Sequence, residues 1–237
     1  MSGCAMQLRC ACAALALLAA ATAGARDEQV GDSYTYRTMD IFSRVEDGRY
    51  RWRVTAVEPG RLVFDDGNWI TDRLGNDEKI GIGAHISGMG VFLPSYDVGA
   101  TWQTRYRYTR ADGAVFVIDY TFTVAGREQV TVPAGTFDTY RVEGGGYIHQ
   151  VSGLRRGRAC DRDSKFRIWV APEQVTRFVA EDYTQRGAPL GCSVYYANTR
   201  TELVAFGRDT DAGTYLTEPR GHHSQIRERP QSGFDDY

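Results

Sequence analysis

Residues 49–56, RYRWRVTA, alternate polar and apolar side chains at every position. Successive side chains of a strand point to opposite faces of its sheet, so this period of two predicts a strand with one buried face and one face in water. Residues 102–108, WQTRYRY, repeat the pattern, with Arg105 and Arg107 opposite the aromatic residues. Antiparallel sheets often expose one face in this way, whereas parallel sheets are usually covered on both. The two stretches therefore predict an antiparallel sheet.

Short segments that contain Asp or Gly favour tight turns between neighbouring antiparallel strands. They are residues 46–48, 65–68, 111–113 and 125–126. Further strands are expected at residues 32–41, 61–64, 69–71, 114–124, 129–132, 136–143, 147–151, 165–170, 175–183 and 193–206. The sequence predicts an all-β fold, a strongly curled antiparallel meander that forms a half-barrel, a partial barrel or a two-layer sandwich, without a substantial helix.

Three segments depart from the alternation. Residues 81–90, GIGAHISGMG, are rich in glycine but lack the residue order of a phosphate-binding loop or of a nucleophile elbow. We expect a flexible surface loop or lid there. Residues 154–164 are expected to form a basic loop, and residues 207–237 a polar, disordered tail.

The N-terminus has the organisation of a secretory signal peptide. Arg9 precedes an uncharged run at residues 11–21, which is followed by small residues suited to cleavage. The run is too short to span a membrane, and no later segment approaches the ~20 apolar residues that a spanning helix needs. Cys10 and Cys12 lie at the start of the run instead of directly after it, which argues against a lipid anchor.

These features divide the chain into a signal peptide at residues 1–25, a single β domain at 26–206 and the tail at 207–237. About 180 residues suffice for one all-β domain with a sizeable core. We expect a periplasmic or secreted product with no transmembrane segment in the mature chain.

Two cysteines, Cys160 and Cys192, follow the predicted leader. An even pair in an oxidising compartment predicts a disulfide between them. Neither cysteine has a second ligand at the spacing of a common metal site, so a reactive thiol or a metal site is the weaker alternative.

The charged and catalytic residue types exclude several functions. The net charge of −2 leaves no concentrated basic surface for nucleic acid. His85 and His149 are isolated from one another, His222 and His223 lie in the tail, and no spacing places two imidazoles for a metal. We therefore expect no metal, no cofactor and no catalytic constellation, although paired carboxylates of a hydrolase cannot be recognised without distances.

Residues 130–142, VTVPAGTFDTYRV, contain the clearest turn. Pro133 cannot donate a hydrogen bond to a neighbouring strand and Gly135 accepts a positive φ, so one strand should end and the next begin here. A structural corner is a better interpretation than a binding role, because turn chemistry alone explains both residues.

The same segment resembles the hallmark of a group of exported bacterial domains of unknown function, the group numbered 3108 and its relatives. Residues 98–102, VGATW, and 167–172, RIWVAP, are similar to two further patches of that group, in the same order and spacing. The resemblance covers about residues 28–206 and implies a periplasmic or cell-surface, mainly antiparallel β domain, comparable with the half-barrels of lipoprotein carriers. It implies no catalytic residue.

Aromatic residues are abundant, with 14 Tyr and 4 Trp. Aromatic-lined concave faces commonly hold sugars, lipids or peptides, although most of these residues belong in the core. The candidates for ligand contact, all expected on inward faces, are Trp52, Trp102, Tyr106, Tyr108 and Trp169.

The sequence favours a non-catalytic cell-envelope protein that binds an apolar or amphipathic ligand, such as a lipid-like molecule, or docks an envelope protein. Two alternatives stay open. One is a structural or assembly module that uses its sheet edges and aromatic face for protein contacts, and the other is a secreted hydrolase.

Overall fold

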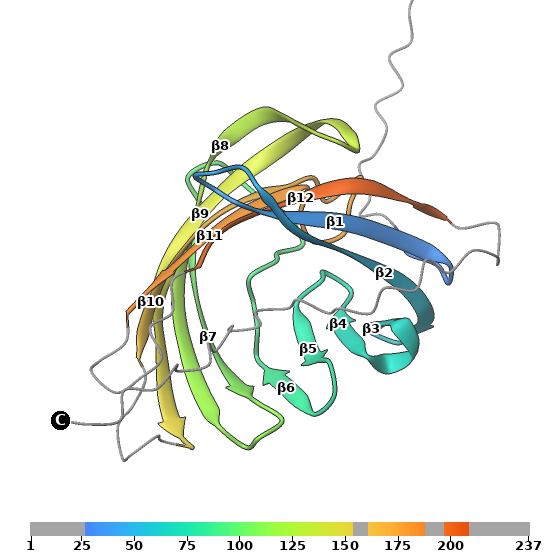
Figure 1. Cartoon of the computed structure of the whole chain (residues 1–237). Coiled ribbons are helices and arrows are strands. Elements are labelled where there is room, and N and C mark those ends of the chain that lie inside the picture. The colour runs from blue at the N-terminus through green and yellow to red at the C-terminus, as the bar shows by residue number, and fades with distance from the viewer. Residues whose placement is uncertain (1–26, 154–160, 188–196, 209–237) are drawn as a thin grey trace, which may run out of the picture.

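The computed structural model describes residues 27–153, 161–187 and 197–208. Within them the chain forms twelve antiparallel strands that close into a barrel, and the only helical element is a short 3-10 turn. Figure 1 shows the strands curving around a common interior. The all-β prediction is confirmed, and the curled meander is a closed barrel.

The strands follow one another around the wall, and β12 pairs with β1 to close it. They are β1 (Asp32–Asp40), β2 (Glu46–Glu58), β3 (Arg61–Phe64), β4 (Trp69–Asp72), β5 (Asp77–Ile80), β6 (Ala84–Ser87), β7 (Thr101–Thr109), β8 (Val115–Val132), β9 (Gly135–Ser152), β10 (Arg162–Val170), β11 (Ala180–Arg186) and β12 (Ala197–Arg208), with the 3-10 turn at Asp65–Gly67. Each strand pairs antiparallel with its neighbours in the chain, so the short-turn prediction holds for most of the wall.

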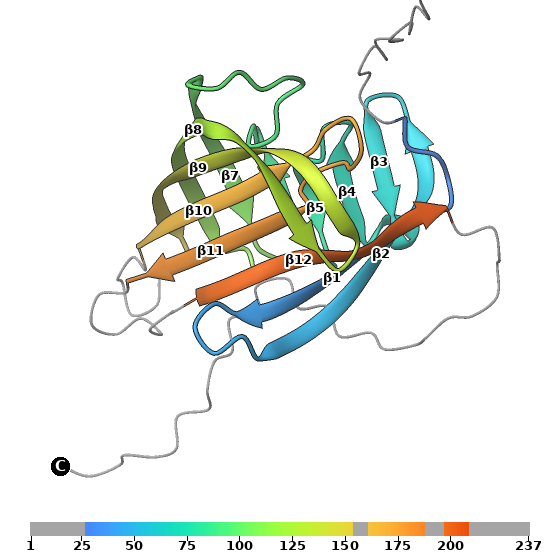
Figure 2. The same ribbon diagram turned by 90° about the horizontal axis from the view of Figure 1, so that it is seen from above.

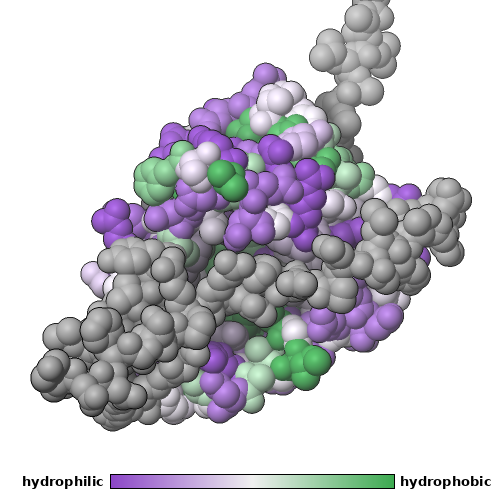
Figure 3. Space-filling view, in the orientation of Figure 1, coloured by the Kyte–Doolittle hydropathy of each residue, from purple (hydrophilic) through white to green (hydrophobic). Residues whose placement is uncertain are grey.

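Alternation along the strands separates the barrel interior from solvent. In β2, Trp52 and Val54 are buried in the core, whereas Arg51 is exposed. In β7, Arg105 and Arg107 are exposed on the face opposite Tyr106. Hydrophobic residues are accordingly scattered among hydrophilic ones on the face shown in Figure 3. The largest apolar side chains therefore meet inside the barrel.

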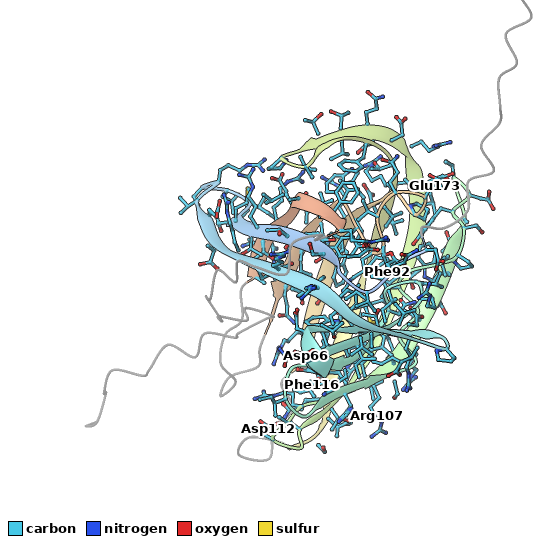
Figure 4. The ribbon with its side chains drawn as sticks, turned by 90° about the vertical axis from the view of Figure 1, so that its right-hand side faces the viewer. Asp66, Phe92, Arg107, Asp112, Phe116 and Glu173 are labelled. Carbon is cyan, nitrogen blue, oxygen red and sulfur yellow. The ribbon has the colours of Figure 1, made fainter. Side chains whose placement is uncertain are left out.

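Two connections fold into this interior. The segment between β6 and β7 buries Val91, Phe92 and Tyr96, and the connection between β10 and β11 buries Val175 and Phe178. The rings of Phe92 and Phe178 stack at 6.5 Å, so the two connections contact one another. Figure 4 places Phe92 within the ribbon and Arg107 near its rim.

Two predictions about these connections are wrong. The glycine-rich segment 81–90 is no surface lid, because residues 84–87 form β6 and pair with both β5 and β7. The strand expected at 175–183 begins only at Ala180, because the preceding residues turn into the core. Arg177 has a φ of 78°, which a regular strand does not allow.

Long strands replace one predicted hairpin and join two strands that the sequence separates. Residues 125–126 do not turn the chain; they lie at an irregularity of register within β8, which runs on to Val132. Likewise β9 continues through the glycines that separate the strands expected at 136–143 and 147–151. At Gly144 a Cβ would lie 2.1 Å from the Phe122 ring, so glycine leaves room for that core side chain.

The turn at Pro133 and Gly135 is confirmed. Val132 pairs with Gly135, so Pro133 and Ala134 form a two-residue connection between β8 and β9. The end of this hairpin bends over the wall, as Figures 1 and 2 show, and the Ala134 N–H donates to the Leu203 carbonyl of β12 at 3.2 Å. The hairpin thus covers part of the neighbouring strands.

Several predictions lie outside the described residues. They are the signal peptide at 1–25, the Cys160–Cys192 disulfide, most of the basic loop and the tail from residue 209 onward. At the near end of the tail, Gly207 and Arg208 belong to β12, where they pair with Ser33 and Asp32. The predicted boundary at residue 206 is therefore two residues too early.

Candidate functional site

Tyrosine rings line the middle of the barrel interior. Tyr36 of β1 and Tyr50 of β2 stack with ring centroids 5.6 Å apart. On the opposite part of the wall, Tyr106 of β7 meets Tyr120 of β8 at 6.1 Å. Burial raises the pKa of each of these four phenols, so all of them stay protonated near neutral pH. The interior is therefore apolar in its walls but rich in hydroxyl groups.

A buried ion pair crosses from the β10–β11 connection to β5. Arg177 donates from Nη1 and Nη2 to the two oxygens of Asp77 at 2.8 and 3.3 Å, and both side chains are at most 9% exposed. The indole Nε1 of Trp69 donates to the same carboxylate at 2.8 Å. Burial raises the pKa of Asp77, and the guanidinium and the indole oppose that effect. The bidentate geometry is that of an ionised carboxylate.

Aromatic rings surround the guanidinium of Arg177. Its central carbon lies 4.9 Å from the Trp52 ring centroid and 5.4 Å from that of Trp69. Phe92 and Phe178 follow at 5.6 and 5.8 Å. Cation–π attraction strengthens when the cation is desolvated, so the rings hold Arg177 in place.

The turn between β4 and β5 positions both interior connections. Gly75 has a φ of 93°, and a Cβ at this position would lie 2.3 Å from the Arg177 Cγ. Its neighbour Asn76 accepts hydrogen bonds from the N–H groups of Val91 and Phe92, both at 2.8 Å. The turn is thus a common support for Arg177 and for Phe92.

Glu181 of β11 is the second carboxyl group of the interior. It shares a face with Tyr183, whose ring lies 4.8 Å from that of Phe166 in the core. Desolvation raises the pKa of Glu181 to about 7, against the opposing influence of Arg177. Among the described residues, no hydrogen bond or ion pair engages its carboxyl group.

Interior side chains keep some accessible surface. Tyr106 and Glu181 are of intermediate exposure, although desolvation by surrounding protein dominates the pKa of both groups. The barrel therefore shields these side chains without closing them off completely. A barrel of eight strands is just wide enough to be filled by side chains or to hold one small ligand, and this wall of twelve strands also encloses the segments that bear Phe92 and Phe178.

Four of the five predicted contact residues lie at this interior. Trp52 is buried beside Arg177, and Trp102 stacks on Phe122 at 5.4 Å. Tyr106 and Tyr108 follow Trp102 along the same face of β7 and are partly exposed. The structure places these residues on the inward face of the wall, while their contact with a ligand stays a prediction.

The inward orientation predicted for Trp169 is wrong. Its indole Nε1 donates to Glu128 at 2.6 Å, and the Arg200 guanidinium lies 4.9 Å from its ring. Side chains alternate between the two faces of β10, and those of Phe166 and Ile168 point to the interior. Trp169 is buried because the β8–β9 hairpin covers it from outside.

Sequence reasoning missed the ionisable centre of the interior. Asp77 and Glu181 look like ordinary surface residues in the sequence, and Arg177 lies in a connection without periodicity. Only the fold brings Arg177 into contact with Asp77, which lies 100 residues earlier in the chain.

Other candidate chemistry is sparse in the described part of the chain. His149 lies 3.3 Å from Asp161 at the surface, and His85 is exposed on β6. No group of three His, Cys, Asp or Glu side chains there could hold a metal ion. None of the described segments is a helix of the length and apolar character that crossing a membrane requires.

Comparison with known proteins gives no identity. No family model and no curated protein sequence matches the chain. Among solved structures, a proposed lipoprotein from Parabacteroides distasonis matches with 12% identity and a TM-score of 0.45, over 76% of this chain and 96% of that one.

Two further solved structures match at a similar level. The hypothetical lipoprotein YmcC from Escherichia coli has 11% identity and a TM-score of 0.41, over 73% of this chain and 83% of that one. A proposed exported protein with a YmcC-like fold from Bacteroides fragilis has 13% identity and a TM-score of 0.46, over 78% of this chain and 99% of that one. At this similarity none of these names transfers to the present chain.

Proposed function

We propose that this chain is an exported, non-catalytic protein of the cell envelope whose barrel interior binds an apolar or amphipathic small molecule. The observation that carries the proposal is the partial exposure of interior side chains such as Tyr106 and Glu181. A wall of aromatic rings with a few polar groups is typical of small-molecule sites. The N-terminal sequence supports export.

A hydrolytic role is less well supported. General acid and base catalysis by two carboxyl groups needs both to be available to the substrate. Asp77 is held by two hydrogen bonds from Arg177 and one from Trp69, so Glu181 would act without a partner. We therefore propose binding without chemistry.

An assembly module is the second candidate. Phe42 and Val45, in the turn between β1 and β2, are 77% and 65% exposed, which favours a protein contact at that turn. Docking along a sheet edge has less support, because the strand order of the described residues closes on itself.

Binding of a neutral hydrophobic dye tests the proposal. N-phenyl-1-naphthylamine should bind the folded protein saturably, with enhanced fluorescence. Tyr106→Ala or Trp102→Ala should weaken binding, because each removes a ring from the interior. Tyr147→Ala is the matched control, since this tyrosine is 59% exposed on β9. Absence of dye binding to the folded protein would contradict the proposal and favour the assembly module.

A further inference from the structure

The carboxyl group of Glu181 is a charge without a counter-charge in direct contact. The charges that act on it are those of Arg177, Asp77 and Asp182. Arg177 is already neutralised by its two hydrogen bonds to Asp77, and Asp182 lies on the other face of β11, where it binds Arg200 at 2.8 Å. An ionised Glu181 therefore adds a negative charge to a part of the interior whose Arg177–Asp77 pair is neutral.

Tyrosine rings line the wall on the side of this carboxyl group. Tyr183, two residues further along β11 and on the same face as Glu181, has its ring 4.8 Å from that of Phe166, which lies 5.1 Å from the Tyr120 ring. Tyr120 in turn meets Tyr106 of β7 at 6.1 Å, so a continuous row of rings runs from β11 to β7. Aromatic faces attract cations, and rings grouped around a site recognise quaternary ammonium ligands in this way.

We propose that the interior ligand is an amphipathic amine, whose protonated nitrogen contacts the Glu181 carboxylate among the tyrosine rings and whose apolar chain lies along the aromatic wall. This inference rests on the proposed function. The chain's own cation, Arg177, shows the same preference, because its guanidinium lies between a carboxylate and aromatic rings. A bound ammonium group would repeat that arrangement at Glu181.

An anionic ligand is the alternative to an amine, and the two classes would be attracted to different charged residues of the interior. Arg162 of β10 lies 5.6 Å from the Phe116 ring centroid, and its charge acts on Tyr108 and Tyr183. A ligand carboxylate would be attracted to Arg162 and repelled by both Glu181 and Asp77. The two ligand classes therefore make opposite predictions for a Glu181 variant.

The inference predicts a pH dependence. A cation binds the ionised form of Glu181, whose pKa is about 7 in the ligand-free protein. Affinity for an amine should therefore fall as the pH decreases through 7, by about tenfold for each unit well below it. The charged groups that act on Glu181 are Arg177, Asp77 and Asp182, and the interior tyrosines stay protonated over this pH range.

Three decyl compounds with different head groups test the inference: decylammonium, 1-decanol and decanoate. Their affinities are compared by displacement of N-phenyl-1-naphthylamine at pH 8 and at pH 6. We expect decylammonium to bind the wild-type protein about tenfold more tightly than decanol at pH 8. Glu181→Gln should remove that preference at both pH values. Asp182→Asn, which removes the neighbouring carboxylate on the outer face, should preserve it.

The outcomes separate this inference from the proposed function. Equal binding of decylammonium and decanol to the wild-type protein would overturn the amine and leave the interior site standing. Tightest binding of decanoate would also overturn it and assign the head group to the arginine region. Failure of all three compounds and of the dye would overturn both.

Discussion

Arg177 is the residue on which the interior depends most. Its backbone lies in the left-handed region, with a φ of 78°, and a conformation of this kind costs about 1–3 kcal/mol in a residue other than glycine. Two hydrogen bonds to Asp77 and the surrounding rings compensate for this strain. Sequence alone could not identify Arg177, because neither its backbone angle nor its partner leaves a local pattern.

Glu181 should make the stability of the protein depend on pH. Its pKa is raised from 4.5 to about 7 by burial, so the folded state binds this proton more tightly than the unfolded state does. The resulting stability is fully present below pH 4.5 and is lost as the pH rises through 7. We expect a loss of up to about 3 kcal/mol in the free energy of unfolding from this group.

Urea denaturation between pH 5 and pH 8 measures this effect. The free energy of unfolding of Glu181→Gln should decline less over this range than that of the wild-type protein, because glutamine does not titrate. Asp182→Asn serves as the control on the opposite face of β11. Identical pH profiles for the wild-type protein and Glu181→Gln would show that Glu181 is not held in a desolvated interior.

At the scale of elements, the turn between β4 and β5 connects the wall to its interior segments. Asn76 bonds to the backbone of Val91 and Phe92 and to Asp72, whose carboxylate also accepts the N–H of Leu74. Short strands alone give this part of the wall few ladder hydrogen bonds. The side-chain bonds of Asn76 therefore stabilise both the turn and the segment that it holds.

Asn76→Ala should lower the free energy of unfolding by about 2–4 kcal/mol, because it leaves buried N–H groups without acceptors. It should also accelerate amide hydrogen exchange at Val91 and Phe92 relative to the rest of the core. Asn68→Ala is the control, since Asn68 is exposed. Wild-type exchange rates at these two amides would contradict the supporting role of the turn.

The elements that sequence predicts best are those with a strict period of two. Residues 49–56 and 102–108 lie in β2 and β7 with the expected faces inward. Ile168, Trp169 and Val170 are all apolar, so alternation could not decide which of them faces the interior. The orientation of Trp169 depends on a hairpin from distant residues.

Glycines explain the other differences between the predicted strands and the observed ones. Residues 125–126 and 144–146 resemble turns locally, yet pairing with long neighbours carries the strands through them. Glycine in a strand often marks a bulge or a close approach of the backbone to a core side chain, as at Gly144 beside Phe122. Local composition cannot distinguish that use of glycine from a turn.

At the scale of the whole molecule, the barrel combines a charged outside with an aromatic inside. On the outer face, Arg200 joins Asp182 and Glu202 across β11 and β12, at 2.8 and 2.6 Å. The antiparallel meander follows from alternation and short connections, which the sequence reveals, whereas its closure by the pairing of β12 with β1 is seen only in the structure. The contents of the interior follow from two connections and from ionisable residues that only the complete fold brings together.

The central claim is that this interior receives a ligand, and the position of a bound molecule tests it most directly. Crystals of the protein soaked with 10-bromodecylamine would show the bromine by anomalous scattering. The account predicts a bromine peak inside the barrel, close to Trp102 at the far end of the decyl chain, with the amine toward Glu181. A well-ordered crystal whose bromine peaks lie only on the outer surface, or which holds none, would contradict it.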